Sequence, residues 1–220
     1  MARLTRHQVK KSEGISLAMV ERILERYCHP RAGRATGWQW ELAFGVAVIV
    51  GYKVLARWDD LRQLRWDASY CEVTELNVRF YLEHRKNAMH NGNFVDVARR
   101  RDGQRGAYEA IVAAWRFFRS GYVLPYISSR GEVDTTRWMP YGKYVQHLRQ
   151  SLVQIGVSTE DSMTFAGQSA RSGAATTCMR EGVEPHQLCR MAGVKSINWG
   201  LGYMRPDFED RLGASRAMGL

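Results

Sequence analysis

The chain of 220 residues lacks an apolar run long enough to cross a membrane. Its longest apolar run covers residues 42–50 and extends weakly to residue 56, but it includes Tyr52 and Lys53. This is short of the roughly 20 apolar residues that a membrane-spanning helix needs. The basic N-terminal residues are not followed by an apolar stretch, so no secretory signal is expected. These features predict an intracellular protein.

Cysteines are also few, and none of the four forms a C-x-x-C pair or has a histidine at zinc spacing. We expect Cys28, Cys71, Cys178 and Cys189 to be reduced and mostly buried. No cluster of His, Cys and carboxylate residues has the spacing of a metal site, and no glycine-rich phosphate loop is present. We therefore expect neither a metal nor a cofactor.

Positive charge, in contrast, is abundant. The formal net charge is +10, from 32 Lys and Arg against 22 Asp and Glu. Such a surface attracts polyanions, which favours nucleic acid as the partner, with an acidic membrane surface or an acidic protein as alternatives. The densest basic run comprises Arg99, Arg100, Arg101 and Arg105. This run is interpreted either as a solvated loop or as a contact with a phosphate backbone.

Hydrophobic periodicity predicts a mainly helical chain with a small antiparallel sheet, an α+β fold. Helices are expected at 16–27, 37–56, 58–66, 106–120, 140–155, 168–181, 184–191 and 195–204. Alternation of apolar and polar residues predicts strands near 78–82 and 94–97, joined by a turn at Asn91-Gly92, and a third strand at 70–73. Residues 120–138 are expected to be irregular.

An arginine box begins at Arg57, within Arg57-Trp58-Asp59-Asp60-Leu61-Arg62-Gln63-Leu64-Arg65-Trp66-Asp67. Asp60 lies three positions after the arginine, and apolar residues follow at Leu61, Leu64 and Trp66. Without further context, an arginine in such a stretch is interpreted as one member of a surface ion pair.

A second arginine, Arg171, stands in a run of small residues and precedes Tyr203 by 32 positions. Gly193 lies ten positions before the same tyrosine. Two guanidinium groups and one phenol are the parts needed to attack a phosphodiester without a metal. Guanidinium is always charged and presents forked donors to phosphate, while the phenol supplies the nucleophile.

This order and spacing resemble the catalytic domain of tyrosine recombinases, the phage integrase family. The resemblance implies a site-specific DNA recombinase or integrase that cuts and rejoins DNA through a 3′-phosphotyrosine intermediate. Tyr203 is then the nucleophile, and Arg57 and Arg171 stabilise the phosphoryl transition state. Lys86, at the end of the first hairpin strand, is the candidate that protonates the 5′ leaving oxygen. The implied partner is double-stranded DNA, bound by a homotetramer on paired sites, with no membrane and no cofactor.

Two positions depart from the family pattern. The histidine expected three residues before Arg171 is Gln168, and the histidine expected after Gly193 is Val194. Gln168 can donate a hydrogen bond to a phosphoryl oxygen but cannot accept the phenolic proton, and Val194 can do neither. We therefore expect a slow or conditionally active enzyme. The alternative is a catalytically inactive DNA-binding relative that keeps the fold.

Lys195 and Trp199 follow Val194 closely and could supply a donor instead, and Lys195 is also a candidate contact with the DNA backbone. The resemblance divides the chain into a basic arm at residues 1–14, a catalytic domain at 15–206 and a tail at 207–220. The family implies that this tail docks into a neighbouring protomer, although packing within the same chain is an equal alternative. The family usually has an additional N-terminal helical module that clamps DNA. Only about 14 residues precede the expected catalytic domain here, so the sequence is either a piece of a longer protein or a minimal form of the family.

Overall fold

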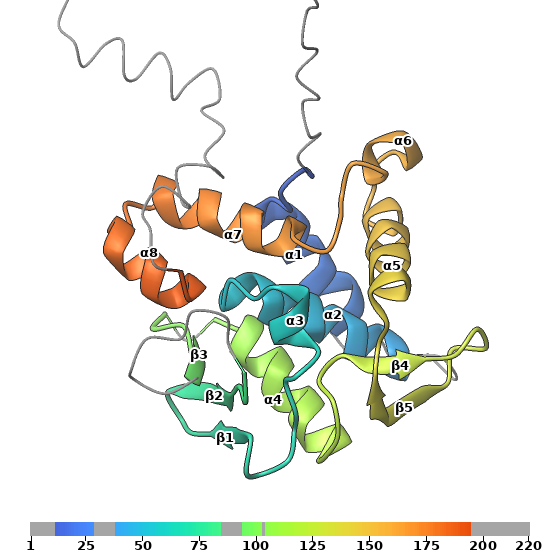
Figure 1. Cartoon of the computed structure of the whole chain (residues 1–220), viewed down its shortest axis with the longest axis horizontal. Helices are drawn as coiled ribbons and strands as arrows, with labels where there is room; N and C mark the ends of the chain where they lie inside the picture. The colour runs from blue at the N-terminus through green and yellow to red at the C-terminus, as the bar shows by residue number, and fades with distance from the viewer. Residues whose placement is uncertain (1–11, 29–37, 85–93, 103, 195–220) are drawn as a thin grey trace, which may run out of the picture.

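The computed structural model describes residues 12–28, 38–84, 94–102 and 104–194. These residues form a mainly helical fold with two small antiparallel sheets (Figure 1). The helices are α1 (Leu17–Ile23), the π-helix η1 (Leu24–Cys28), α2 (Trp38–Lys53), α3 (Trp58–Leu61), α4 (Ala107–Phe118), α5 (Tyr141–Gln154), α6 (Thr159–Ser162), α7 (Ser169–Arg180) and α8 (Pro185–Ala192). The strands are β1 (Cys71–Val73), β2 (Asn77–Tyr81), β3 (Phe94–Ala98), β4 (Pro125–Ile127) and β5 (Val133–Trp138). The fold class expected from the sequence is therefore confirmed.

Helix α2 forms the centre of the core. It is apolar on nearly every side, and every residue from Leu42 to Tyr52 is buried. Figure 1 shows α2 between α7 and α4, both of which contact it. The Tyr52 hydroxyl shares a hydrogen bond of 2.6 Å with the Thr177 hydroxyl, which joins α2 to α7. A helix without a polar face can only be stable when other elements surround it, as the sequence predicted.

The three-stranded sheet has the order β1-β2-β3, and its second and third strands lie where the alternation of apolar and polar residues predicted them. Val78 is paired with Val97 and Phe80 with Val95, and all four side chains are buried on one face. The predicted turn at residues 91 and 92 lies outside the described residues. Because the side-chain period of a strand is two, this register keeps the apolar face of the sheet against the core.

The prediction of an irregular segment at residues 120–138 was wrong. Strands β4 and β5 form a two-stranded sheet there, with Ile127 paired to Val133 and a turn at Gly131, whose φ is 82°. β5 is half-buried at its start and exposed at its end, so its sequence shows no apolar alternation. The sequence pattern that indicates a strand was therefore absent, although the segment forms one by pairing with β4.

The helix predicted at 58–66 is also shorter than expected, since α3 ends at Leu61. Arg62 and Gln63 form a turn after it, and the chain from Leu64 to Trp66 then pairs with the segment that leads into β4. The amide of Trp66 donates to the carbonyl of Gly121 at 2.8 Å, and the amide of Val123 donates to the carbonyl of Leu64 at 2.9 Å. These bonds fasten the arginine box to the β4–β5 hairpin.

The small-residue run of α7 packs against the start of the described chain. The amide of Ile15 donates to the carbonyl of Ser169 at 2.9 Å. A Cβ placed on Gly173 would lie 1.8 Å from the carbonyl oxygen of Ile15, so only glycine fits at this contact. Gly14, which the sequence assigns to the end of the N-terminal arm, lies against the backbone of Gly173 in the same contact.

The four cysteines are free thiols, with Cys28 and Cys71 buried and Cys178 and Cys189 half-buried. No helix within the described ranges is both long enough and apolar enough to span a bilayer.

Candidate functional site

Arg171 lies at the centre of the candidate site, on α7, and its side chain is fully buried. Nη1 donates to the carbonyl oxygen of Leu55 at 2.5 Å, and Nη2 donates to the carbonyl oxygen of Ala192 at 2.9 Å. Leu55 follows the C-terminal end of α2, and Ala192 ends α8. The carbonyls at the end of a helix carry partial negative charge, so both sites suit a guanidinium.

Leu55 adopts a left-handed conformation with a φ of 51°, which is uncommon for a residue other than glycine. Its carbonyl accepts the bond from Arg171, two residues before Arg57. Two residues of extended chain span at most about 7 Å. The structure therefore brings Arg171 close to the backbone that carries Arg57.

Arg57 is half-buried and caps the N-terminus of α3. Its amide donates to Oδ2 of Asp60 at 2.9 Å, and Asp60 is only 3% exposed. This is the second half of a capping box, in which an acidic residue at the third helical position bonds back to the residue before the helix. The acidic residue noted in the sequence thus holds the main chain of Arg57 in place.

Gly193 ends α8 with a φ of 60° and a ψ of 48°, a left-handed helix cap that glycine adopts without strain. Val194 follows it, donates its amide to the carbonyl of Cys189 at 3.0 Å and packs its side chain against the core. Position 194 is therefore part of the packing and offers no side-chain donor. Through Ala192, Arg171 also fixes the point from which the chain continues toward Tyr203.

Gln168 is exposed at the N-terminal end of α7, three residues before Arg171. Its carbonyl accepts from the amide of Ser172 at 2.9 Å. Lys86, Lys195 and Tyr203 lie outside the described residues, as does Trp199, so their predicted roles stay predictions.

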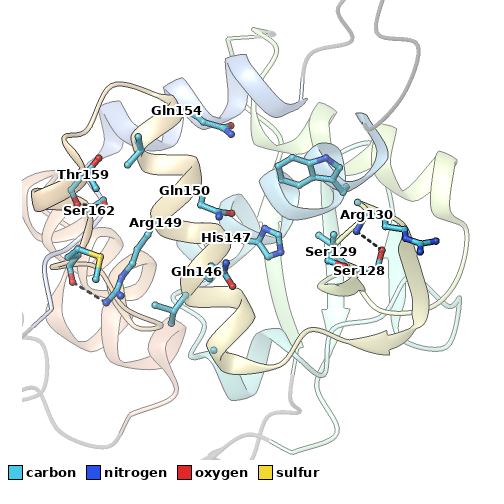
Figure 2. Close-up of a pocket in the computed structure, with 17 residues that line it drawn as sticks. Ser128, Ser129, Arg130, Gln146, His147, Arg149, Gln150, Gln154, Thr159 and Ser162 are labelled. Carbon is cyan, nitrogen blue, oxygen red and sulfur yellow. Dashed lines mark hydrogen bonds between the residues drawn. The ribbon is translucent and has the colours of Figure 1, made fainter.

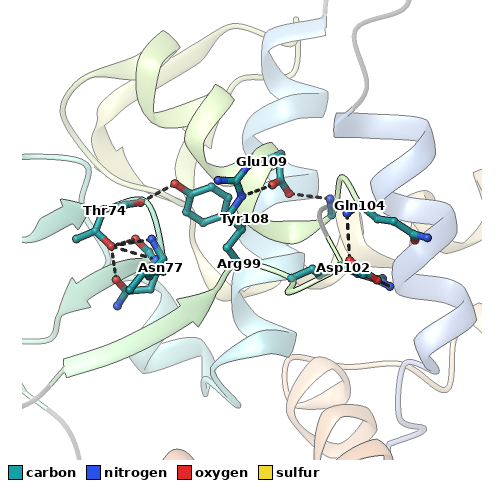
Figure 3. A network of polar contacts seen from close by, with 10 residues as sticks. Thr74, Asn77, Arg99, Asp102, Gln104, Tyr108 and Glu109 are labelled. Carbon is teal, nitrogen blue, oxygen red and sulfur yellow. Dashed lines mark hydrogen bonds and ion pairs between the residues drawn. The ribbon is translucent and has the colours of Figure 1, made fainter.

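The basic run at the start of α4 is partly neutralised within the chain (Figure 3). Arg99 pairs with Glu109 at 3.2 Å, and Arg100 pairs with Asp102 through two nitrogens, the shorter contact being 2.5 Å. This pairing raises the pKa of Arg100 and lowers the pKa of Asp102. The two remaining arginines of the run are exposed and make no ion pair with the described residues; they are Arg101 and Arg105.

A groove of about 960 Å³ lies beside α5, away from the two arginine boxes. Figure 2 shows His147 of α5 between this helix and the loop that carries Ser128, Ser129 and Arg130. Burial lowers the pKa of His147, and the neighbouring Lys143 adds to the effect. None of the predicted site residues lines this groove. Within the described ranges, no three His, Cys, Asp or Glu side chains are grouped to hold a metal ion.

Sequence reasoning missed the two carbonyl oxygens that hold Arg171. Main-chain groups carry no sequence signal of their own, and nothing in the residues around Leu55 indicates its left-handed conformation. The only clue was the small-residue run of α7, a composition that allows close helix packing.

The fold is that of tyrosine recombinase catalytic domains. One similar solved structure is the XerH site-specific recombinase bound to its difH substrate before cleavage, with a TM-score of 0.59 and 10% sequence identity over 92% of this chain. Another is a Tn1549 transposon integrase fragment in complex with a circular intermediate DNA, with a TM-score of 0.57 and 11% identity over 96% of this chain. This chain spans 53% of the XerH chain and 67% of the integrase chain. No protein-family model and no curated protein matches the sequence.

Proposed function

We propose that this chain is the DNA-breaking and rejoining part of a site-specific recombinase. The observation that carries this proposal is the placement of Arg171, which bonds both to the turn before Arg57 and to the end of α8 that leads toward Tyr203. It occurs in a fold shared with XerH, whose structures are complexes with a DNA substrate before and after cleavage. The proposed partner is accordingly double-stranded DNA.

In the proposed reaction, the phenolic oxygen of Tyr203 forms a bond to the phosphorus, and the bond from phosphorus to the 5′ oxygen breaks. Tyr203 gives its proton to solvent water, because no residue at positions 168 and 194 can accept it, and Lys86 gives a proton to the departing oxygen, which leaves as a hydroxyl. Arg57 is half-buried and presents donors to the phosphoryl oxygens. Arg171 adds a positive charge in surroundings of low dielectric, where charges act more strongly than in water. The reverse reaction with another 5′ hydroxyl rejoins the strand without external energy.

The departures at residues 168 and 194 make the enzyme slow. Loss of general acid–base help costs about 10²–10⁴ in rate, and an exposed glutamine restores only a hydrogen bond. A second candidate function is DNA binding without cleavage. The packing of Val194 against the core favours this second candidate, because an apolar side chain held in the core cannot donate a hydrogen bond to phosphate.

A nicked suicide DNA substrate tests the two candidates, with its sequence taken from the DNA that flanks the reading frame. Cleavage traps the protein on the DNA as a covalent adduct, which a denaturing gel detects. We expect a slowly formed adduct that is lost in Tyr203→Phe and kept in Tyr108→Phe, which removes a hydroxyl that donates to the carbonyl of Thr74 instead. Salt-sensitive binding without any adduct would support the second candidate, and no binding to DNA would contradict both.

Recombination between paired sites also requires several protomers on the DNA. We propose a homotetramer, with residues 207–220 as the segment exchanged between neighbours. Mass measurement of the complex on paired sites tests this, and removal of these residues is expected to leave protomers on DNA that do not assemble further.

A further inference from the structure

Aromatic rings and guanidinium groups contact one another in a continuous series next to Arg57, and both ring–ring contacts are edge to face. The series includes residues of the arginine box, the segment before β4, the last residue of β5 and the first residue of α5. Its members, in spatial order, are Arg65, Tyr122, Trp138, Arg62, Trp58 and Tyr141. We call these six residues the stacking row.

The distances along the stacking row are short and regular. Cζ of Arg65 lies 5.0 Å from the ring centroid of Tyr122, and the rings of Tyr122 and Trp138 are 5.6 Å apart at 75°. Cζ of Arg62 lies 5.8 Å from the Trp138 ring and 5.4 Å from the ring of Trp58. Each of these guanidinium contacts is within the range of a cation–π interaction, so the side chains hold one another in place.

The stacking row is accessible from solvent. Trp138 is 43% exposed and Tyr141 is 48% exposed, which is high for large aromatic side chains. Such rings gain free energy by covering their faces, so exposure of two in one row marks a surface that receives a partner.

The charges of the stacking row fit an anionic partner. Asp59 binds Nε of Arg62 at 3.1 Å, and Asp67 binds Nε of Arg65 at 2.9 Å. Within the described part of the chain, no hydrogen bond reaches the terminal nitrogens of either arginine. Those nitrogens are the ones that bind phosphate in a forked geometry. Lys143, which lies 4.3 Å from the ring of the neighbouring Tyr126, adds further positive charge at the hairpin.

One end of the stacking row, formed by Trp58 and Tyr141, meets the candidate site. Trp58 directly follows Arg57, and its ring lies 5.6 Å from that of Tyr141. The hydroxyl of Tyr141 accepts from the amide of Gly167 at 3.4 Å, beside Gln168. A Cβ on Gly167 would lie 2.3 Å from the Tyr141 ring, so the ring is seated directly on this backbone. A strand bound at Arg57 and Gln168 would therefore continue over the row.

We infer that the stacking row binds unpaired nucleotides of the DNA next to the cleavage position. Exposed aromatic faces stack with bases of any sequence, and arginines bind the phosphates between them. Paired bases in a duplex cover one another's faces, so only an unpaired segment offers the surface that fits this row. The inference rests on the proposed function, since it places the DNA at Arg57.

Fluorescence anisotropy with the whole chain tests the inference and needs no knowledge of the target site. The probes are a duplex of about 30 base pairs and the same duplex with a central bubble of about six unpaired positions, lengths on the scale of known single-strand binding sites. We expect tighter binding to the bubble. Trp138→Ala and Tyr141→Ala are each expected to weaken binding to the bubble about tenfold and to the duplex less than about twofold.

Two controls separate stacking from general effects. Phe117→Ala removes an aromatic side chain of similar exposure, 42%, from α4 outside the row, and should change neither affinity. Trp138→Phe keeps a ring and should keep most of the preference for the bubble.

A second measurement uses the unaltered chain, so it does not depend on the folding of a variant. Iodouracil placed in the bubble is crosslinked by light, and the attached peptide is identified by mass spectrometry. Crosslinks at Trp138 or Tyr141 support the inference. Equal binding to both probes, or crosslinks only elsewhere, would overturn it and leave the proposed function intact. Failure to bind either probe would contradict the proposed function as well.

Discussion

Nη1 of Arg171 donates to the carbonyl oxygen of Leu55 at 2.5 Å, across 116 positions of sequence. This bond joins the helix of the second arginine to the turn that precedes the first. Leu55, which accepts this bond, adopts a φ of 51°, a left-handed conformation that is uncommon for a residue other than glycine. The same guanidinium reaches Ala192, so one side chain connects three segments that are distant in sequence.

Replacement of Arg171 by alanine should therefore destabilise the fold as well as abolish adduct formation. It leaves two buried main-chain carbonyls without their donor, and we expect the free energy of unfolding to fall by about 3 kcal/mol. Arg57→Ala is the matched control. The Arg57 side chain makes no hydrogen bond with the described residues, so its loss should change stability by less than about 1 kcal/mol while still abolishing the adduct.

Urea denaturation followed by circular dichroism measures both values. Equal stability of the two variants would show that the carbonyl bonds of Arg171 contribute nothing to folding. An adduct that persists in Arg57→Ala would remove this residue from the proposed reaction.

Asp60→Ala should loosen the main chain of Arg57. The carboxylate is buried and accepts the Arg57 amide, and loss of a cap of this kind costs about 1 kcal/mol. Asp60→Asn keeps an oxygen acceptor and should recover most of both stability and adduct rate. Thermal unfolding and the suicide substrate provide the two measurements. If the alanine and asparagine variants behave alike, the hydrogen bond from the Arg57 amide is not what Asp60 contributes to stability and activity.

The contact between Gly173 and Ile15 predicts that stability falls steeply when any side chain is added at position 173. Gly173→Ala places a methyl group against the main-chain carbonyl of Ile15, whose amide is itself bonded to Ser169, and should cost about 2–3 kcal/mol. Gly142→Ala, in α5, is the control because nothing lies within 4 Å of its Cβ position. There alanine should stabilise the protein by about 0.5–1 kcal/mol through its helix propensity. If Gly173→Ala leaves the free energy of unfolding unchanged, the backbone at Ile15 can shift to accommodate the methyl group.

The sequence predicted those elements that have a clear apolar pattern, either a continuous apolar run or an alternation. α2 is apolar all round, β2 alternates, and each was placed within a few residues of its observed bounds. β5 was missed because an exposed strand has no apolar period to detect, and the end of α3 was misplaced because pairing with residue 121 and its neighbours overrides helical spacing.

The candidate site likewise has features that the sequence could indicate and features that it could not. Arg57, Asp60 and Arg171 were proposed from a family resemblance that rests on residue type and spacing, which reflect side-chain chemistry. The bonds of Arg171 to Leu55 and Ala192 could not be found, because main-chain oxygens are identical at every position and only the fold selects two of them. Nor does spacing reveal that Arg62 lies between Trp58 and Trp138, since the two rings are 80 positions apart.

The buried thiols predict a pH-dependent difference in reactivity. Burial raises the pKa of Cys28 and of Cys71 to about 12 from 9.0. At pH 8 their thiolate fraction is then about a thousandfold below that of an exposed thiol, so alkylation in the folded state should be very slow. Cys189, on a half-buried position of α8, should react first. Mass spectrometry after timed alkylation, with and without denaturant, measures this.

The same pKa shifts affect stability in alkali. The pKa of each thiol in the folded state lies above its pKa in the unfolded state. The contribution of each thiol to the free energy of unfolding is therefore complete below pH 9 and is lost as the pH rises toward 12. A Cys28→Ser variant should show a smaller decline over this interval. Fast labelling of Cys28 in the folded protein at pH 8 would contradict both expectations.

Variants of the basic run can distinguish direct contact with DNA phosphates from the effect of the protein's net charge. Arg101 and Arg105 make no ion pair with the described residues, so we expect each change to glutamine to reduce the slope of log affinity against log salt by about one. Arg100→Gln should change the slope less, because Asp102 already binds that guanidinium. Arg116→Gln removes the same formal charge from the exposed side of α4 and serves as the control. Anisotropy titrations between low and moderate salt give the slopes. If Arg116→Gln reduces the slope as much as Arg101→Gln does, the run acts only through the net charge of the protein and does not contact phosphate.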